Sequence, residues 1–308
     1  MKRSVRRATG TSTVAQATTL EMQAWTTEAI IRWAADDFRA RGVDTARLDA
    51  EVLLAHALST TRVQLIVDAK RPLEADELAR FRALVRRRRA REPVAYLLGT
   101  REFYGRSFRV DRRVLVPRPD TETLVETALE RTRHVSMAMR ALDLCTGTGC
   151  VAITLARERP TSRVTATDVS ADALAVARDN ALRLGAYNVS FRRGDLFSAV
   201  EPSCRFDLVA GNPPYVASAE IPSLPPEIRD HEPRLALDGG DDGLAIVRRI
   251  VIDAPAYLAP AGVLALEVGA GESAAVVELL ARAGFASVQV QRDYGRVERV
   301  VSGVLHKP

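Results

Sequence analysis

The 308-residue chain is 47% hydrophobic and 27% charged, which is ordinary for a soluble globular protein and allows one large α/β domain plus a smaller one. No apolar run approaches the roughly 20 residues of a membrane helix, and three cysteines without metal-ligand spacing indicate a cytoplasmic protein with reduced thiols and no metal site. The net charge of +5 lies toward the N-terminus, since residues 100–308 carry 26 basic and 27 acidic residues; this balance argues against a direct nucleic-acid substrate.

The first 25 residues are rich in Arg, Ser, Thr and Ala and have no apolar core for a secretory signal. We predict a disordered extension over residues 1–25. Because the segment bears arginines and few acids, a mitochondrial transit peptide is the alternative interpretation.

Residues 26–99 have the pattern of a small bundle of short helices. Apolar residues recur at helical spacing in three stretches: Ile30, Ala34 and Phe38; Leu48, Val52 and Ala55; Leu78, Phe81 and Val85. Asp44 is a suitable N-cap for the second helix. The run Arg86–Arg89 is typical of a solvated helix face, with a contact for an anionic partner as the alternative.

Residues 100–119 alternate between apolar and polar side chains and predict a β-hairpin that links two domains. Phe108 and Val110 lie on one side of an expected turn at Asp111–Arg113, and Leu115 lies on the other. Asp120 is then positioned to cap a helix that opens the second domain, residues 120–308.

The second domain begins with a pattern that is typical of nucleotide binding. A short apolar strand, 141–144, runs into the turn Cys145-Thr146-Gly147-Thr148-Gly149, and a helix follows from residue 150. A second strand, 163–168, ends in Asp168, an acid at the place where such folds bind ribose hydroxyls. Ala152 stands where a dinucleotide-binding fingerprint has its third glycine, and because alanine is sometimes accepted there, a dinucleotide enzyme stays open at this point.

Two later motifs favour a different chemistry. A third strand, 188–192, precedes Gly194-Asp195-Leu196-Phe197, an acid and two apolar side chains positioned to contact an adenine. A fourth strand, 206–210, ends at Asn212-Pro213-Pro214-Tyr215, where two prolines stiffen the backbone. The Asn212 side-chain carbonyl and the Pro213 backbone carbonyl suit the two hydrogens of a planar NH2 group, and Tyr215 offers an aromatic surface for it.

The rest of the chain completes an open α/β sheet. The long, proline-broken connection 216–243 is expected to face the substrate. A helix over 244–257, with Pro255 near its end, leads to strands at 262–268, 287–290 and 297–304. A hairpin around Gly295-Arg296 is expected to bring one antiparallel strand into the sheet.

The motifs together resemble the HemK/PrmC family of S-adenosylmethionine-dependent protein methyltransferases from Thr26 to Gly303. The matching segments are Glu92–Tyr96, Phe103–Gly105, Pro117–Pro119, Thr121-Glu122, Asp143-Leu144, Gly147–Gly149, Asn212–Tyr215, Glu232-Pro233, Gly239-Gly240, Gly243-Leu244 and Glu267–Gly269. Where this chain has Cys145, the family most often has glycine, and the extra Cβ narrows the approach to the methionine part of the cofactor.

The resemblance implies a class I methyltransferase with a Rossmann-like, seven-stranded mixed sheet and an N-terminal helical domain, 26–99, that recognises the substrate. It implies methylation of the glutamine side-chain nitrogen in the Gly-Gly-Gln motif of peptide-chain release factors by a monomer that needs no membrane. The implied catalytic residues are Asn212, Pro213, Pro214 and Tyr215; the implied cofactor residues are Cys145, Thr146, Gly147, Thr148, Gly149, Asp168, Asp195, Leu196 and Asn212.

Three other functions share parts of this pattern. A ribosomal-protein glutamine methyltransferase has the same clamp, as does a nucleic-acid amino-methyltransferase, although the chain has no large target-recognition insertion. A non-enzymatic module that senses S-adenosylmethionine is the alternative of a different class, and the intact Asn212–Tyr215 motif argues against it.

Overall fold

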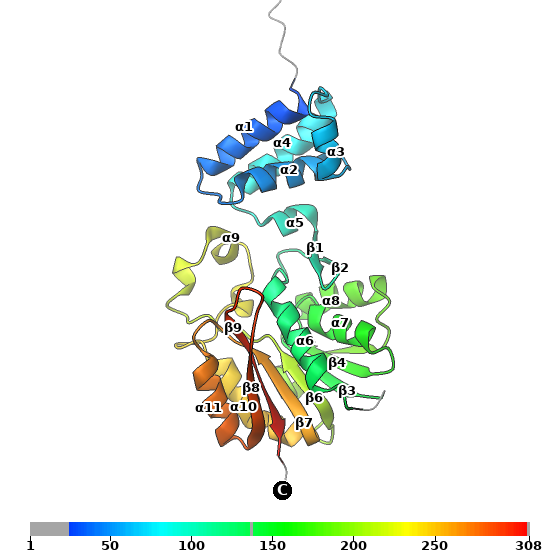
Figure 1. Ribbon diagram of the computed structural model, residues 1–308, viewed down its shortest axis with the longest axis vertical. Helices are drawn as coiled ribbons and strands as arrows, with labels where there is room; N and C mark the ends of the chain where they lie inside the picture. Colours follow the sequence, from blue (N-terminus) through cyan, green and yellow to red (C-terminus); the bar gives the residue numbers. More distant parts are fainter. Residues whose placement is uncertain (1–24, 136–137, 307–308) are drawn as a thin grey trace, which may run out of the picture. The chain divides into compact units, whose positions relative to one another are not determined.

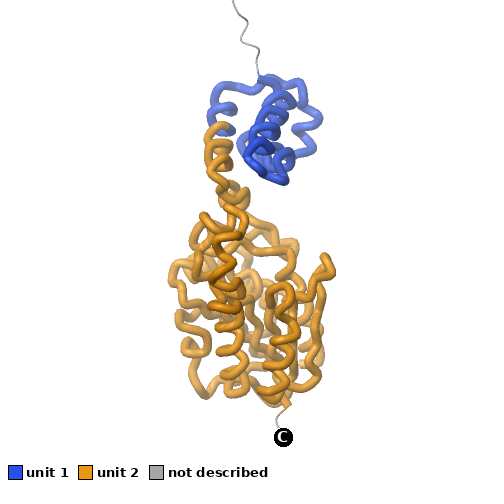
Figure 2. Tube along the Cα trace, turned by 90° about the vertical axis from the view of Figure 1, so that its left-hand side faces the viewer, with its two compact units in different colours: residues 1–81 blue, residues 82–308 orange. Residues whose placement is uncertain are grey.

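The computed structural model describes residues 25–135 and 138–306, in two compact units that divide after Phe81 (Figure 2). The predicted extension over residues 1–25 lies, up to residue 24, outside the described residues. Across the part of the chain that is described, no helix is both long and apolar enough to span a membrane.

The first unit is a helical bundle. It contains α1 (Thr27–Arg39), α2 (Ala46–Ala57), α3 (Arg62–Val67) and the start of α4 (Ala75–Arg89). Its core includes the predicted stripe of α1, but in α2 the buried leucines are Leu53 and Leu54, while the predicted Leu48 is 43% exposed. Of the stripe predicted in α2, Ala55 is buried and Leu48 is not. The predicted cap was also wrong, because Thr45 occupies the N-cap position of α2.

The second unit opens with the end of α4, and here the arginine run is not a solvated face throughout. The Arg88 side chain is 4% exposed and pairs with Glu227 at 2.8 Å, and Arg91 reaches the other carboxylate oxygen of Glu227 at 2.8 Å. His231 also contacts the backbone carbonyl of Ala90 at 2.8 Å. The part of the chain that contains Glu227 and His231 is thus tied to the end of α4 and to the residues that follow it.

A short helix, α5 (Val94–Leu98), leads into a hairpin of β1 (Thr100–Phe103) and β2 (Arg106–Arg109). The turn lies at Tyr104-Gly105, both with positive φ, which matches the twist of a tight two-residue hairpin. A turn does lie at the predicted 111–113, where the Val114 N–H donates to the Asp111 carbonyl at 3.1 Å, but it follows the hairpin and does not join its strands.

The main sheet has seven strands in the order β5-β4-β3-β6-β7-β9-β8 (Figure 1). They are β3 (Arg140–Leu144), β4 (Arg163–Asp168), β5 (Val189–Arg193), β6 (Phe206–Gly211), β7 (Leu258–Glu267), β8 (Phe285–Arg292) and β9 (Glu298–Leu305). The first five in this order pair in parallel, and β9 is antiparallel to both of its neighbours. The predicted mixed sheet and its C-terminal hairpin are confirmed.

Helices cover both faces of the sheet. They are α6 (Glu122–Arg131), α7 (Cys150–Glu158), α8 (Ala171–Arg183), α10 (Ala245–Tyr257) and α11 (Ser273–Arg282), with the short α9 (Pro226–Arg229) and the 3-10 turns η1 (Pro119–Thr121), η2 (Leu196–Ala199), η3 (Ile221–Ser223) and η4 (Arg234–Ala236). Neighbouring residues of β3 enter different cores: Ala141 packs with α6 and α7, and Leu142 packs with α10. Such two-sided burial is why these strands read as continuous apolar runs.

The fold also shows where a ligand is expected. From β3 the chain moves outward to β4 and β5, and then returns to place β6 on the other side of β3. In open parallel sheets this reversal leaves a crevice at the carboxyl ends of the two central strands. Here those ends are Leu144 and Gly211, which are also register partners.

Candidate active site

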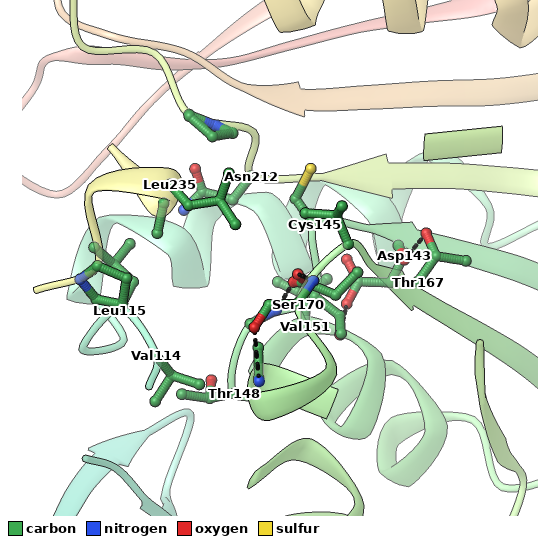
Figure 3. Close-up of a pocket in the computed structure, with 18 of the residues that line it drawn as sticks. Val114, Leu115, Asp143, Cys145, Thr148, Val151, Thr167, Ser170, Asn212 and Leu235 are labelled. Atoms are coloured by element: carbon green, nitrogen blue, oxygen red, sulfur yellow. Dashed lines mark hydrogen bonds between the residues drawn. The ribbon is translucent and has the colours of Figure 1, made fainter. Parts of the chain in front are cut away.

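A cavity of about 360 Å³ lies at this crevice, within the second unit (Figure 3). Loops that follow β3, β4, β5 and β6 all contribute to its wall, together with residues 113–121 and residues 233–238. Figure 3 shows the labelled side chains of Cys145, Ser170, Asn212 and Leu235 around this space. The cavity therefore brings together side chains that are far apart in the sequence.

The loop between β3 and α7 turns sharply at three positions with positive φ. They are Cys145 at 57°, Gly147 at 54° and Gly149 at 81°. Cys145, Thr146, Gly147 and Thr148 line the cavity, and Gly149 is not among the lining residues. A Cβ at Gly149 would lie 2.8 Å from the Cδ1 atom of Ile153, so this glycine allows α7 to begin against α8.

Asp143, in β3, holds the loop between β3 and α7 in place through hydrogen bonds. It is 1% exposed, and its Oδ2 atom accepts hydrogen bonds from the Thr146 hydroxyl at 2.6 Å and from the Ala152 N–H at 3.1 Å. The second bond places the carboxylate at the N-terminal turn of α7, where a negative charge is favoured. Burial nevertheless raises the pKa of Asp143 to about 7.

Asp168 stands at the end of β4, opposite the glycine loop. Its Oδ2 atom accepts the Gly147 N–H at 2.9 Å, and its Oδ1 atom accepts the Ser170 N–H at 2.9 Å. Burial raises the pKa of the Asp168 carboxyl, and these backbone hydrogen bonds oppose that rise. Each oxygen of an ionised carboxylate can accept a further hydrogen bond, so this fixed group can receive the hydroxyls of a sugar.

Two of the three residues that were predicted to border an adenine line the cavity. Asp195 and Leu196 do so, and Leu196 has a φ of 50°, which is unusual for a non-glycine residue. Asp195 also pairs with Arg249 at 2.6 Å. Phe197 is 2% exposed and stacks on Tyr257 with a centroid distance of 4.6 Å, so this part of the prediction was wrong.

The four residues of the predicted clamp take different places. Asn212 and Pro214 line the cavity, while Pro213 and Tyr215 are not among the lining residues. The Asn212 side-chain NH2 donates to the Thr121 hydroxyl at 3.2 Å. The Tyr215 hydroxyl donates to the Glu267 Oε1 atom at 3.4 Å, and burial raises the pKa of Tyr215.

Several residues of the cavity had no role in the sequence analysis. Arg118 lines the cavity and pairs with Glu232, whose side chain is 1% exposed, at 2.7 Å. Thr121, Ser170 and Leu235 also line it. Arg118, Thr121 and Glu232 belong to the motifs Pro117–Pro119, Thr121-Glu122 and Glu232-Pro233, which was the available signal, but only the fold shows that these motifs meet. Asp120, which was predicted to cap α6, instead pairs with Arg299 at 3.5 Å.

The chain matches two protein-family descriptions. Residues 29–99 match the PrmC N-terminal domain, and residues 119–224 match the methyltransferase small domain. Among solved structures, the hMettl16 catalytic domain superposes with a TM-score of 0.56 at 16% identity, covering 70% of this chain and 82% of that one. This likeness concerns the fold, which is that of a class I methyltransferase with a seven-stranded mixed sheet.

Curated relatives match over most of their length. The release factor glutamine methyltransferase of Geobacter sulfurreducens is 44% identical over 279 residues, covering 91% of this chain and 96% of the relative. That of Cereibacter sphaeroides is 45% identical over 276 residues, covering 89% and 97%. With identity at this level over about nine-tenths of the chain, which includes both matched domains, the chain belongs to the release factor glutamine methyltransferase family.

Proposed function

We propose that this chain transfers a methyl group from S-adenosylmethionine to the side-chain nitrogen of the glutamine in the Gly-Gly-Gln motif of peptide-chain release factors. The observation that carries the proposal is the position of Asn212, which lines the same cavity as Gly147 and Asp168. A carboxamide that can hold a planar NH2 group thus shares one space with groups that can hold a nucleoside. The named activity of the curated relatives supports the choice of substrate.

The cavity fits the cofactor on three counts. The Asp168 oxygens, each fixed by a backbone N–H at 2.9 Å, suit the two ribose hydroxyls. Leu196 and Ile246 supply apolar surface for the adenine, and the glycine loop brings backbone close to the methionine part. A volume of about 360 Å³ is in the range of small-molecule sites. When bound, S-adenosylmethionine supplies a methyl group activated by a positively charged sulfur.

The protein's task is then one of positioning. An amide nitrogen is a poor nucleophile because its lone pair is delocalised into the carbonyl. The Asn212 Oδ1 atom and the Pro213 carbonyl are proposed to accept the two N–H hydrogens of the glutamine and to aim the nitrogen at the methyl carbon. Orientation of this kind lowers a barrier by about 7–11 kcal/mol in favourable cases, and preorganised dipoles add to it.

The bond changes balance without a redox partner. The nitrogen–carbon bond forms as the carbon–sulfur bond breaks, and the electron pair of that bond leaves with the sulfur. The nitrogen then releases one proton. Solvent water takes up this proton. The Asn212 oxygen acts earlier, because it stabilises the positive charge that develops on the nitrogen during the transfer.

The test compares methyl acceptors. With radiolabelled cofactor, we expect label in a release factor and none in its Gln→Ala variant. Label in a ribosomal protein or in DNA, with none in the release factor, would overturn the proposed substrate and favour one of the alternatives. Asn212→Ala should lower the transfer rate at least about tenfold while the cofactor dissociation constant changes less. An unchanged rate would contradict the role of Asn212.

Two further parts of the proposal concern organisation. We propose that the helical region 26–99 recognises the protein substrate and that residues 120–308 bind the cofactor. Substitutions of exposed residues on α1 should then raise KM for the release factor and leave the dissociation constant of the cofactor unchanged. We also propose that the enzyme is a cytoplasmic monomer, which light scattering of the purified chain and fractionation of cells test.

A further inference from the structure

The orientation of the Asn212 carboxamide decides whether the proposed clamp works. A 180° rotation about its last bond exchanges Oδ1 and Nδ2, which have nearly the same size and shape. With Oδ1 toward the cavity, the group accepts a hydrogen from a substrate NH2. With Nδ2 there, it presents a second NH2 to the substrate and repels it. Something must hold the first orientation.

The contact that holds it comes from a different element. Thr121 ends η1, is 2% exposed, and receives the Asn212 Nδ2–H at 3.2 Å. A side-chain hydrogen bond from Thr121 also lowers the pKa of the carboxyl of Glu267, the last residue of β7. Glu267 is 1% exposed and receives a further hydrogen bond from the Tyr215 hydroxyl at 3.4 Å. A chain of hydrogen bonds thus runs from the buried end of β7 to the wall of the cavity.

The direction of these hydrogen bonds follows from the number of protons. An ionised carboxylate accepts hydrogen bonds and donates none. The Thr121 hydroxyl has a single proton, which is used when it donates to Glu267. Its oxygen can then only accept, and the only partner on Asn212 that donates is the NH2 group. Ionised Glu267 therefore fixes Nδ2 toward Thr121 and leaves Oδ1 for the cavity.

We propose that Thr121 and Glu267 are positioning residues that set the orientation of the Asn212 carboxamide and thereby make the site selective for a planar NH2 group. The inference rests on the proposed function, because it concerns how the same site recognises its substrate. Neither residue touches the reacting atoms. Their effect passes through Asn212.

The same reasoning predicts a dependence on pH. Burial raises the pKa of Glu267 to about 7, and the hydrogen bond from Thr121 opposes this rise. The charged and titratable groups around it are Asp120, Tyr215 and Arg299, from η1, the β6 end and β9. Once protonated, Glu267 can donate to Thr121, whose proton is then free to turn toward Asn212 and favour the flipped carboxamide. The rate should therefore fall as the pH drops through about 7.

The first experiment separates the hydroxyl from the space it fills. Thr121→Val keeps the shape and removes the hydroxyl, and Thr121→Ser restores the hydroxyl. We expect Thr121→Val to lower kcat at least about tenfold with the cofactor dissociation constant within about twofold, and Thr121→Ser to recover most of the loss. Thr127→Val is the matched control, since Thr127 is a buried threonine of α6 whose hydroxyl has no hydrogen-bond partner among the described residues. Equal losses in the valine and serine variants, or none in the valine variant, would overturn the proposal.

The second experiment uses Glu267→Gln, which cannot ionise. We expect its kcat to be low and to lack the fall that the wild-type enzyme shows below about pH 7. If the variant keeps the wild-type rate and pH profile, the role of Glu267 is refuted.

A third measurement does not depend on activity. The chain has three asparagines, Asn180, Asn188 and Asn212, so asparagine labelled with ¹⁵N in its side chain gives three NH2 signals. The Asn212 pair, assigned with Asn212→Ala, should exchange slowly with solvent in the wild type and faster in Thr121→Val. If this difference is found but no substrate is methylated, the proposed function fails and the hydrogen-bond chain stands. If transfer is found but neither exchange nor kcat responds to Thr121→Val, the hydrogen-bond chain fails and the function stands.

Discussion

The replacement Asp168→Asn tests the proposed ribose contact with little change in shape. Both carboxylate oxygens are held by backbone N–H groups, from Gly147 and from Ser170, at 2.9 Å each. Asparagine keeps one acceptor oxygen and turns an NH2 group toward the other position. It therefore loses about one charge-assisted hydrogen bond to the ribose, and a bond of this kind contributes about 1.5–3 kcal/mol. The new NH2 group also faces one of the two backbone N–H groups, which adds to the loss.

A loss of about 1.5–3 kcal/mol corresponds to a dissociation constant raised roughly 13- to 160-fold. Isothermal titration calorimetry with S-adenosylmethionine and with S-adenosylhomocysteine measures it directly. The kcat at saturating cofactor should change less, since Asp168 is not proposed to contact the glutamine. Asp195→Asn on the same wall gives a comparison for the dissociation constant. We expect a smaller rise there, because the Arg249 side chain that pairs with Asp195 is 49% exposed and exposed pairs contribute about 0–1 kcal/mol.

Ligand analogues make the test specific. S-adenosylhomocysteine analogues that lack the 2′- or the 3′-hydroxyl should bind the wild type more weakly than the parent compound. With Asp168→Asn, the affinity of these analogues relative to the parent compound should fall much less, because the missing hydroxyl then has no charged partner. If the loss is the same in both proteins, Asp168 does not bind the ribose and its effect on affinity must pass through the loop that it holds.

Three stability predictions follow from other contacts, each measured by chemical or thermal unfolding. Gly149→Ala should lower the free energy of unfolding more than Gly271→Ala does. Both glycines have positive φ (81° and 87°), but only a Cβ at Gly149 would lie 2.8 Å from a side chain. Equal losses of about 1–2 kcal/mol, the cost of the φ strain alone, would refute the packing role. Asp143→Asn can keep both hydrogen bonds, which share Oδ2, and it removes a carboxyl whose pKa is raised to about 7, so its stability relative to wild type should rise between about pH 4 and 7. A difference in the free energy of unfolding between variant and wild type that does not change with pH would contradict this prediction. Glu227→Gln removes the carboxylate that pairs with the buried Arg88 and should destabilise the second unit by about 3 kcal/mol with little dependence on salt, whereas a loss that vanishes in high salt would indicate a solvated pair.

Local patterns in the sequence predicted the strands well. The bounds predicted for β4 are those observed, and β3 and β6 each extend one residue beyond the prediction. These strands are buried on both faces and end at glycine or polar residues, so their apolar runs have clear limits. Asn212 and the loop that begins at Cys145 both line the cavity for the same reason, because each directly follows such a strand.

The errors share a cause, which is that nearby residues do not decide every contact. Asp120 has the chemistry of an N-cap, yet it pairs with Arg299, 179 positions later in the chain. Asp44 precedes α2 by one residue too many, because the helix begins after Thr45. Arg88 belongs to a run of four arginines, and its burial and its pairing with Glu227 distinguish it from a solvated residue.

The roles proposed for Thr121 and Glu267 could not be predicted from the sequence, for a related reason. Each stands in a motif that the sequence analysis noted, but neither motif carries a role by itself. Their meaning comes from the order of the strands: because β7 pairs with β6, the last residue of β7 lies beside the segment that follows Gly211. The carboxyl end of β7 therefore lies next to the carboxyl end of β6. Thr121 of η1 contacts Asn212, which follows β6, and Glu267, which ends β7.

This arrangement explains how a rigid site is made without a strong base. The glycine loop, Asp168 and Asn212 follow β3, β4 and β6, which are adjacent and in parallel register. The distances between the three groups are thus set by strand spacing, and a buried sheet resists change in that spacing. Orientation is the one degree of freedom that the strands leave open at Asn212, since a carboxamide can turn without moving its backbone. A hydrogen-bond chain from Glu267 restricts that freedom, so the same sheet that positions the clamp also determines which way it faces.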